Sequence, residues 1–173
     1  TLDAGYMIAP EIGYIHLDRF GATSGNEVHE MLKKLKKEGM KDLILDLTIN
    51  GGGYLGAAIE IANEFLEEDE LIVYTEGRAA PRTTYKAKGG GIFRKGQLVV
   101  LVDEFSASAA EILSGSLQDL DRAVVIGNRT YGKGLVQTLR ELPYNSSMKI
   151  TTAKYYIPSG RCVQAIDYSK RNA

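Results

Sequence analysis

The chain has 173 residues, of which 44% are hydrophobic and 25% are charged, and its net charge is −1. This composition is ordinary for a soluble globular protein, and the length fits one domain. The nearly balanced charge gives no electrostatic reason to expect a nucleic-acid partner, and no apolar run approaches the length of a membrane helix. Cys162 is the only cysteine, which excludes an internal disulfide and leaves the redox compartment open.

The chain begins abruptly, almost directly before a strand-like segment, and residues 1–20 lack the pattern of a signal peptide. We therefore expect an excised piece of a longer protein, from which a targeting segment has been removed. Residues 1–173 are expected to form a single core domain.

Short apolar runs alternate with segments of helical periodicity. Strands are predicted at residues 12–17, 42–47, 71–75, 97–103 and 123–126. Helices are predicted from Ser24 to Gly39, with Ser24 and Glu27 as a capping box, after the glycine turn 50–53, and from Ser106 to about Leu120.

Two segments depart from this regular alternation of strands and helices. Residues 136–142 and 148–157 are expected to pair as a hairpin across residues 143–147. Residues 76–96 show no period and are expected to form a long loop or a pair of weak edge strands, beside a binding cleft. The whole order predicts an α/β domain with a mostly parallel sheet and an antiparallel C-terminal hairpin.

Ser108 is the candidate nucleophile, because it lies where the most apolar strand passes into a helix. Its hydroxyl is expected beside free backbone N–H groups and the positive end of the helix dipole, which suits an attack that creates an oxyanion. Ser108-x-x-Glu111 is also a capping box, and the spacing alone favours capping over catalysis. Ser106 can supply the cap instead, which would leave Ser108 free.

Lys133 makes the catalytic interpretation stronger. It lies on a glycine-rich loop after a predicted strand, with no acidic residue within several positions. A lysine in this setting can lose its water and become neutral, and a neutral amine can accept a proton from a serine. Taken without Ser108, it would be read as an exposed loop lysine.

Other chemistries find less support. Residues 127–134 match the G-x-x-x-x-G-K spacing of a phosphate-binding loop, but Gly134 replaces the hydroxyl residue that holds magnesium. His16 lies within a strand and His29 on the polar face of a helix, which disfavours a Ser-His-Asp triad. No cluster has metal-ligand spacing, so neither a metal nor a cofactor is expected.

Four ordered blocks of the sequence resemble the carboxyl-terminal processing peptidases, also called tail-specific proteases. The blocks are LILDLTINGGG at 43–53, SASAAEILSGSLQD at 106–119, RA at 122–123 with Gly127 and TYGKGLVQ at 130–137, and TTAKYYIPSG at 151–160. The resemblance covers nearly the whole chain and implies the α/β core of that family. It assigns the nucleophile to Ser108 and the base to Lys133, with Gln137 positioning the lysine amine.

The resemblance also implies an oxyanion hole made of backbone N–H groups. Ala109 would supply one, and Gly52 the other, with Gly53 nearly as good. Asp119 matches a family position of less settled role and is a candidate for support of the site. It would lie on the same helix face as Ser108, and a surface ion pair with Arg122 explains it equally well.

The sequence departs from the family pattern at several positions. Thr48 and Ile49 replace an arginine and an asparagine, Gly51 replaces a frequent proline, Ala110 a hydroxyl residue, and Phe105 a small residue. We expect Phe105 to reshape the substrate groove. Most members also carry a PDZ domain, for which this chain has no room.

The resemblance implies a serine endopeptidase that cuts protein substrates, recognised near their C-termini, through an acyl-enzyme. It also implies an extracytoplasmic location, periplasmic or in the cell envelope. The alternative is a non-catalytic peptide-binding module of the same fold. Nucleic acid is not expected as a partner, and the sequence leaves the oligomeric state open.

Overall fold

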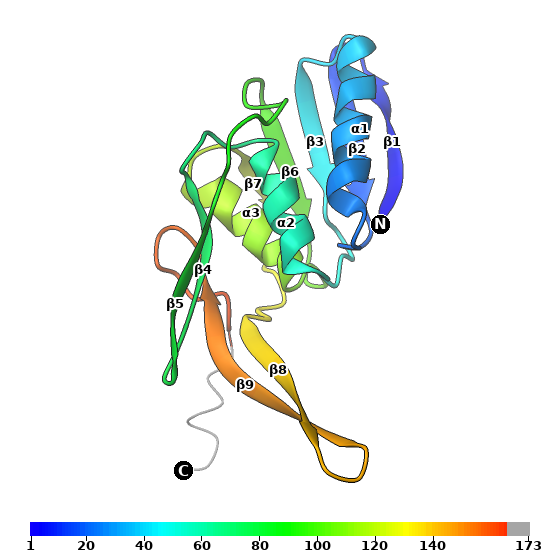
Figure 1. Cartoon of the computed structure of the whole chain (residues 1–173). Coiled ribbons are helices and arrows are strands. Elements are labelled where there is room, and N and C mark those ends of the chain that lie inside the picture. The colour runs from blue at the N-terminus through cyan, green and yellow to red at the C-terminus, as the bar shows by residue number, and fades with distance from the viewer. Residues whose placement is uncertain (166–173) are drawn as a thin grey trace.

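A computed structural model of the chain describes residues 1–165 (Figure 1). Within this range the strands are β1 Leu2–Ala9, β2 Ile12–Leu17, β3 Asp42–Asp46, β4 Leu71–Gly77, β5 Ala80–Lys86, β6 Leu98–Val102, β7 Val124–Gly127, β8 Leu135–Leu142 and β9 Ser146–Tyr156. The helices are α1 Ser24–Lys37, α2 Leu55–Asn63 and α3 Ala109–Asp119.

The main sheet has the strand order β1-β2-β3-β6-β7. Strands β2, β3, β6 and β7 run parallel, and β1 pairs antiparallel with β2 at the edge. The apolar side chains of β3 and β6, with those of α1 to α3, form a core in which Leu45, Val100 and Leu113 are fully buried. Strands covered in this way read as continuous apolar runs, which is why the sequence identified them.

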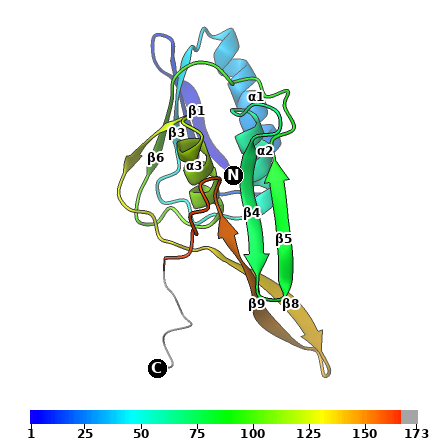
Figure 2. The same cartoon turned by 90° about the vertical axis from the view of Figure 1, so that its left-hand side faces the viewer.

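The helices α1 and α2 lie side by side over one face of this sheet, and the β4–β5 hairpin lies on the same side of the sheet, where β4 contacts α3 (Figure 2). Helix α3 contacts α2, β4 and β7. The predicted α/β architecture with a mostly parallel sheet is thus confirmed.

The predicted C-terminal hairpin forms as β8 and β9, but it is not attached to the parallel sheet. It belongs to a second, antiparallel sheet of order β5-β4-β9-β8 and projects away from the body of the molecule (Figure 1). Tyr144 and Asn145 turn the hairpin with φ values of 63° and 54°. Residues 76–96 hold the end of β4, the edge strand β5 and a loop, and border a cavity formed by α1 and α2, away from Ser108.

One strand was not predicted, and one predicted helix cap was wrong. Strand β1 has no counterpart in the predicted elements, because its short mixed pattern resembles a loop until it pairs with β2. Helix α1 begins after Thr23, and Ser24 does not cap it: the Ser24 hydroxyl donates to Arg19 O instead. Glu27 accepts from Leu2 N–H at 2.9 Å, so it holds β1 to the helix.

Within residues 1–165, no helix combines the length and apolar character that crossing a bilayer requires.

Candidate active site

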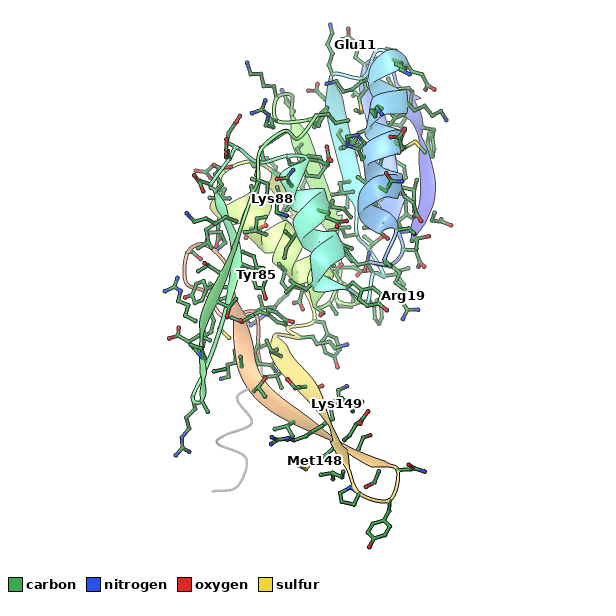
Figure 3. The ribbon with its side chains drawn as sticks, viewed as in Figure 1. Glu11, Arg19, Tyr85, Lys88, Met148 and Lys149 are labelled. Carbon is green, nitrogen blue, oxygen red and sulfur yellow. The ribbon has the colours of Figure 1, made fainter. Side chains whose placement is uncertain are left out.

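Three loops meet at the carboxyl ends of the adjacent strands β3, β6 and β7, the edge of a parallel sheet where catalytic groups gather. Backbone hydrogen bonds join them. Ala107 N–H donates to Asn50 O at 2.9 Å, and Tyr131 N–H donates to Ser106 O at 3.1 Å. Arg19 lies at this end of the main sheet and Glu11 at its opposite end (Figure 3). The glycine turn, the serine segment and the lysine loop therefore form one connected surface.

Ser108 is the N-cap residue of α3 and has a φ of 56°. Residues other than glycine seldom adopt positive φ, and such strain persists only where the surroundings impose it. The expected alternative, in which Ser106 caps the helix, was wrong. Ser106 is fully buried, and its hydroxyl donates to Leu47 O at 2.7 Å, which ties the serine segment to β3.

Glu111 links the two halves of the site. Its carboxylate is buried and accepts from Ser108 N–H at 2.8 Å, Gly132 N–H at 2.6 Å and Lys133 N–H at 2.8 Å. The capping-box spacing identified the first of these bonds, but the other two span more than twenty residues. One side chain thus fixes the backbone of the candidate nucleophile relative to that of the candidate base.

We predict that Glu111→Gln destabilises the fold by about 1–3 kcal/mol, because an amide nitrogen replaces one of the oxygens that accept buried N–H groups. Urea unfolding of the variant and of the wild type measures this difference. Glu104→Gln is the matched control, because Glu104 is exposed and its carboxylate accepts from the Asn128 side chain at 3.0 Å. Equal unfolding midpoints for Glu111→Gln and the wild type would contradict the role given to this carboxylate.

Ser108 and Lys133 line the same cavity, of about 440 Å³, together with Asp18, Arg19 and the 51–53 turn. Within residues 1–165, no hydrogen bond joins the Ser108 hydroxyl to the Lys133 amine. Lys133 is exposed in the structure, which contradicts the expectation that its amine is shielded from water.

A second cavity, of about 780 Å³, shares Lys133 with the first. Gln137, near the start of β8, lines it, as do Phe105 and Ile49. Gln137 is exposed and returns to the side of Lys133, as expected for an extended segment. Phe105 and Ile49 are 59% and 71% exposed, so two of the departures from the family pattern form apolar walls of this cavity.

The glycine turn lies against the start of α3. A Cβ built on Gly52 would lie 2.8 Å from Ser108 Cβ and 3.0 Å from Ala109 N. The Gly52 N–H donates to the buried Asn50 side chain at 2.8 Å, whereas the N–H groups of Ala109 and Gly53 have no acceptor within residues 1–165. The candidate oxyanion donors Gly52 and Ala109 are therefore adjacent, but the Gly52 N–H already donates to the Asn50 side chain.

Asp119 does not pair with Arg122. Its carboxylate accepts from Ser159 N–H at 2.9 Å and pairs with Arg161 at 3.0 Å. The Arg122 guanidinium instead donates to the carbonyls of Phe65, Gly96 and Phe93. The local spacing of Asp119 and Arg122 suggested a pair, but the tertiary structure gives each residue a different partner.

Two aspartates brace the loops that follow β3 and β6. Burial opposes the ionisation of Asp103, but hydrogen bonds from Ile49 N–H, Phe105 N–H and Ser106 hold its pKa below the ordinary value of 3.8. Burial likewise opposes the ionisation of Asp46, and bonds from Tyr14 and Thr48 hold its pKa below 3.8. Nothing in the sequence marked either residue.

These shifts predict acid sensitivity. A carboxyl group whose pKa is depressed in the folded state stabilises that state fully above its unfolded pKa, and this contribution is lost as the pH falls through the folded pKa. The free energy of unfolding should therefore fall as the pH drops below about 4, the ordinary pKa of an aspartate. Urea unfolding at a series of pH values checks this, and a smaller acid-dependent loss is expected in Asp103→Asn. An identical pH dependence in that variant would count against the assignment.

Both histidines pair with carboxylates outside the candidate site. His29 contacts Glu64 at 2.9 Å and His16 contacts Asp3 at 3.2 Å, both away from the loops that meet at Ser108. Among the described residues no group of three or more His, Cys, Asp or Glu side chains is placed to hold a metal ion. Strand β8 follows residues 127–134, where a phosphate-binding loop needs a helix.

Residues 11–169 match the protein family described as Peptidase family S41. A carboxyl-terminal-processing protease of Picosynechococcus sp. is 45% identical over 148 residues, which are 86% of this chain and 35% of that protein. Carboxyl-terminal-processing peptidase 3 of Arabidopsis thaliana, described as chloroplastic, is 39% identical over 85% of this chain and 28% of that protein.

Among solved structures, the photosystem II D1 C-terminal processing protease superposes with a TM-score of 0.84 and 34% identity. The alignment covers 88% of this chain and 39% of that one, so the chain spans about a third of the length of the relatives it matches. The family match contains all three loops that meet at Ser108, and together with the shared fold it shows that the chain belongs to peptidase family S41.

Proposed function

We propose that this chain is the catalytic core of a serine endopeptidase, in which Ser108 is the nucleophile and Lys133 the general base. The observation that carries the proposal is the arrangement of these two residues. A serine held at positive φ on a strand-to-helix turn lines one cavity with a lysine, and the Glu111 carboxylate binds the backbone N–H of both residues.

The reaction follows from that arrangement. The neutral Lys133 amine takes the proton of the Ser108 hydroxyl while the serine oxygen attacks the scissile carbonyl carbon. The resulting oxyanion accepts hydrogen bonds from Ala109 N–H and from a glycine of the 51–53 turn. Lys133 then gives its proton to the departing amine, the carbon–nitrogen bond breaks, and an acyl-enzyme remains. Water, deprotonated by Lys133, hydrolyses the ester and restores Ser108.

The exposed lysine places a condition on this mechanism. Removal of water from around a lysine amine lowers its pKa and favours the neutral form. Bound substrate would supply this by covering the cleft between the two cavities that share Lys133. Gln137, in the second cavity, would then orient the amine, and Phe105 and Ile49 would contact apolar substrate side chains.

Of the two glycine donors, Gly53 requires the smaller change. Its N–H is free within the described residues, whereas Gly52 would have to share or release its bond to Asn50. Each oxyanion donor of this kind contributes about 3–4 kcal/mol to transition-state stabilisation.

The substrate class and location are part of the same proposal. The names of the similar proteins refer to processing at a carboxyl terminus, and one is described as chloroplastic. We infer protein substrates recognised near their C-termini and an extracytoplasmic location. Residues 1–173 are taken as one catalytic core, which leaves recruitment of the substrate to other parts of a longer protein.

Degradation of casein, an unfolded protein, tests the proposal. The wild type and the control Ser147→Ala, at an exposed serine near the start of β9, should cut casein, and Ser108→Ala should not. Activity that survives in Ser108→Ala would remove the nucleophile from the proposal. A wild type that binds casein without cutting it would favour the alternative, a non-catalytic peptide-binding module.

A further inference from the structure

Residues 157–165 form a small hairpin that follows β9. Ile157 N–H donates to Arg161 O at 3.1 Å, and Val163 N–H donates to Tyr155 O at 3.0 Å. A bridge between Tyr156 and Cys162 continues the pairing. This 157–165 segment therefore has a defined conformation, with its turn at one end and residues 164–165 at the other.

The end of the 157–165 segment binds the lysine loop. Ala165 N–H donates to Gly132 O at 3.1 Å, and Gly134 N–H donates to the Gln164 side chain at 2.9 Å. The approach is close on both sides of Lys133, because a side chain on Gly132 would collide with Ala165 and one on Gly134 would collide with Gln164. The segment thus holds the loop immediately before and after the candidate base.

The turn of the 157–165 segment is attached to the last residue of α3. The Asp119 side chain is only 9% exposed, accepts from Ser159 N–H at 2.9 Å and pairs with Arg161 at 3.0 Å. A carboxylate in the last turn of a helix faces the negative end of the helix dipole, which is unfavourable unless a specific partner compensates it. Here the partners belong to the 157–165 segment.

The Lys133 backbone is therefore held from two sides. Glu111, in the first turn of α3, binds Gly132 N–H and Lys133 N–H, and the 157–165 segment binds Gly132 O and Gly134 N–H. Gly132 has a φ of 87°, and glycines on both sides leave the loop little rigidity of its own. The position of the lysine amine then depends on both attachments.

We propose that Asp119 is a positioning residue for Lys133, which acts through the 157–165 segment and not by contact with substrate. The proposal rests on the proposed function, because it assigns Lys133 as the base. Without the Asp119 carboxylate, the turn of the segment loses its attachment to α3, and the segment constrains the lysine loop less, although the bonds from Glu111 and the bond between Tyr131 N–H and Ser106 O remain. A displaced base reduces the rate of the chemical step more than the binding of substrate.

The test compares Asp119→Ala with Asp119→Asn in the full chain, with Asp121→Asn as the control, since Asp121 is exposed two residues further on. The first readout is amide hydrogen exchange at Gly134, which needs no turnover. Exchange at Gly134 should accelerate in Asp119→Ala and less in Asp119→Asn, which keeps an oxygen for Ser159 N–H. Exchange in β3 and the unfolding midpoint should stay near the wild type in all three variants.

The second readout is peptide hydrolysis. Asp119→Ala should lower kcat by roughly 10-fold to 100-fold with KM little changed, and Asp119→Asn should recover most of the loss. Wild-type exchange at Gly134 in Asp119→Ala, faster exchange throughout α3 and β3, or wild-type kcat would each overturn the proposal. The two proposals fail in distinguishable ways: an inactive wild type removes the peptidase function, whereas the exchange readout decides the attachment without turnover.

Discussion

Lys133→Met should lower kcat/KM for peptide hydrolysis by about 10³-fold or more, because it removes the group that takes the serine proton. Lys133 is exposed and its amine makes no ion pair within residues 1–165, so the free energy of unfolding should change by less than about 0.5 kcal/mol. Steady-state hydrolysis of a fluorogenic peptide, with urea unfolding in parallel, measures both quantities.

Two further variants make this prediction specific. Lys149→Met removes an exposed lysine of the projecting β8–β9 hairpin (Figure 3) that lines neither cavity, and it should retain wild-type activity. Lys133→Arg keeps the positive charge but cannot supply a neutral base, because a guanidinium does not deprotonate in proteins. It should be as inactive as Lys133→Met. Full activity in Lys133→Arg would show that only a charge is needed there.

Gly52→Ala should lower kcat by about 10²-fold or more and also destabilise the fold. Gly52 has a φ of 91°, and a Cβ there would lie 2.6 Å from Ala107 O and 2.8 Å from Ser108 Cβ. Ala107 and Ser108 are backbone neighbours at the start of α3, so the turn or the nucleophile has to shift. Either shift separates Ser108 and Ala109 from the donors of the glycine turn.

Gly51→Ala is the matched control for this prediction. A Cβ on Gly51 would have no atom within 4 Å, and its φ is not positive, so the variant should behave as the wild type in both stability and kcat. Peptide hydrolysis and urea unfolding of the two variants decide the matter. A normal kcat in Gly52→Ala would show that the packing of this turn against Ser108 does not matter for the reaction.

The sequence predicted the parallel strands and the three loops at their carboxyl ends because both are local signals. Strands β3 and β6 are short, mostly apolar runs whose side chains are all buried or half-buried, and the loops are marked by glycine, serine and lysine directly after them. Once the strands are parallel and adjacent, residues as distant as Gly52, Ser108 and Lys133 must lie at one edge. The resemblance to processing peptidases then supplied the roles.

What the sequence did not predict depends on contacts between distant residues. Strand β1 exists because it pairs with β2, and β4 leaves the parallel sheet to pair with β5 and β9. Asp119 pairs with Arg161, forty-two positions away, and not with its neighbour Arg122. Glu111 was visible as a cap of Ser108, but its bonds to the lysine loop required the loop to return to the helix.

The central claim is that Lys133 activates Ser108, and covalent labelling tests it most directly. A fluorophosphonate forms a stable ester with an activated serine hydroxyl, and mass spectrometry of the digested chain identifies the residue that carries it. The account predicts one adduct, on Ser108, that forms far more slowly in Lys133→Met. An adduct on another serine, or equally fast labelling of Ser108 in Lys133→Met, would contradict it.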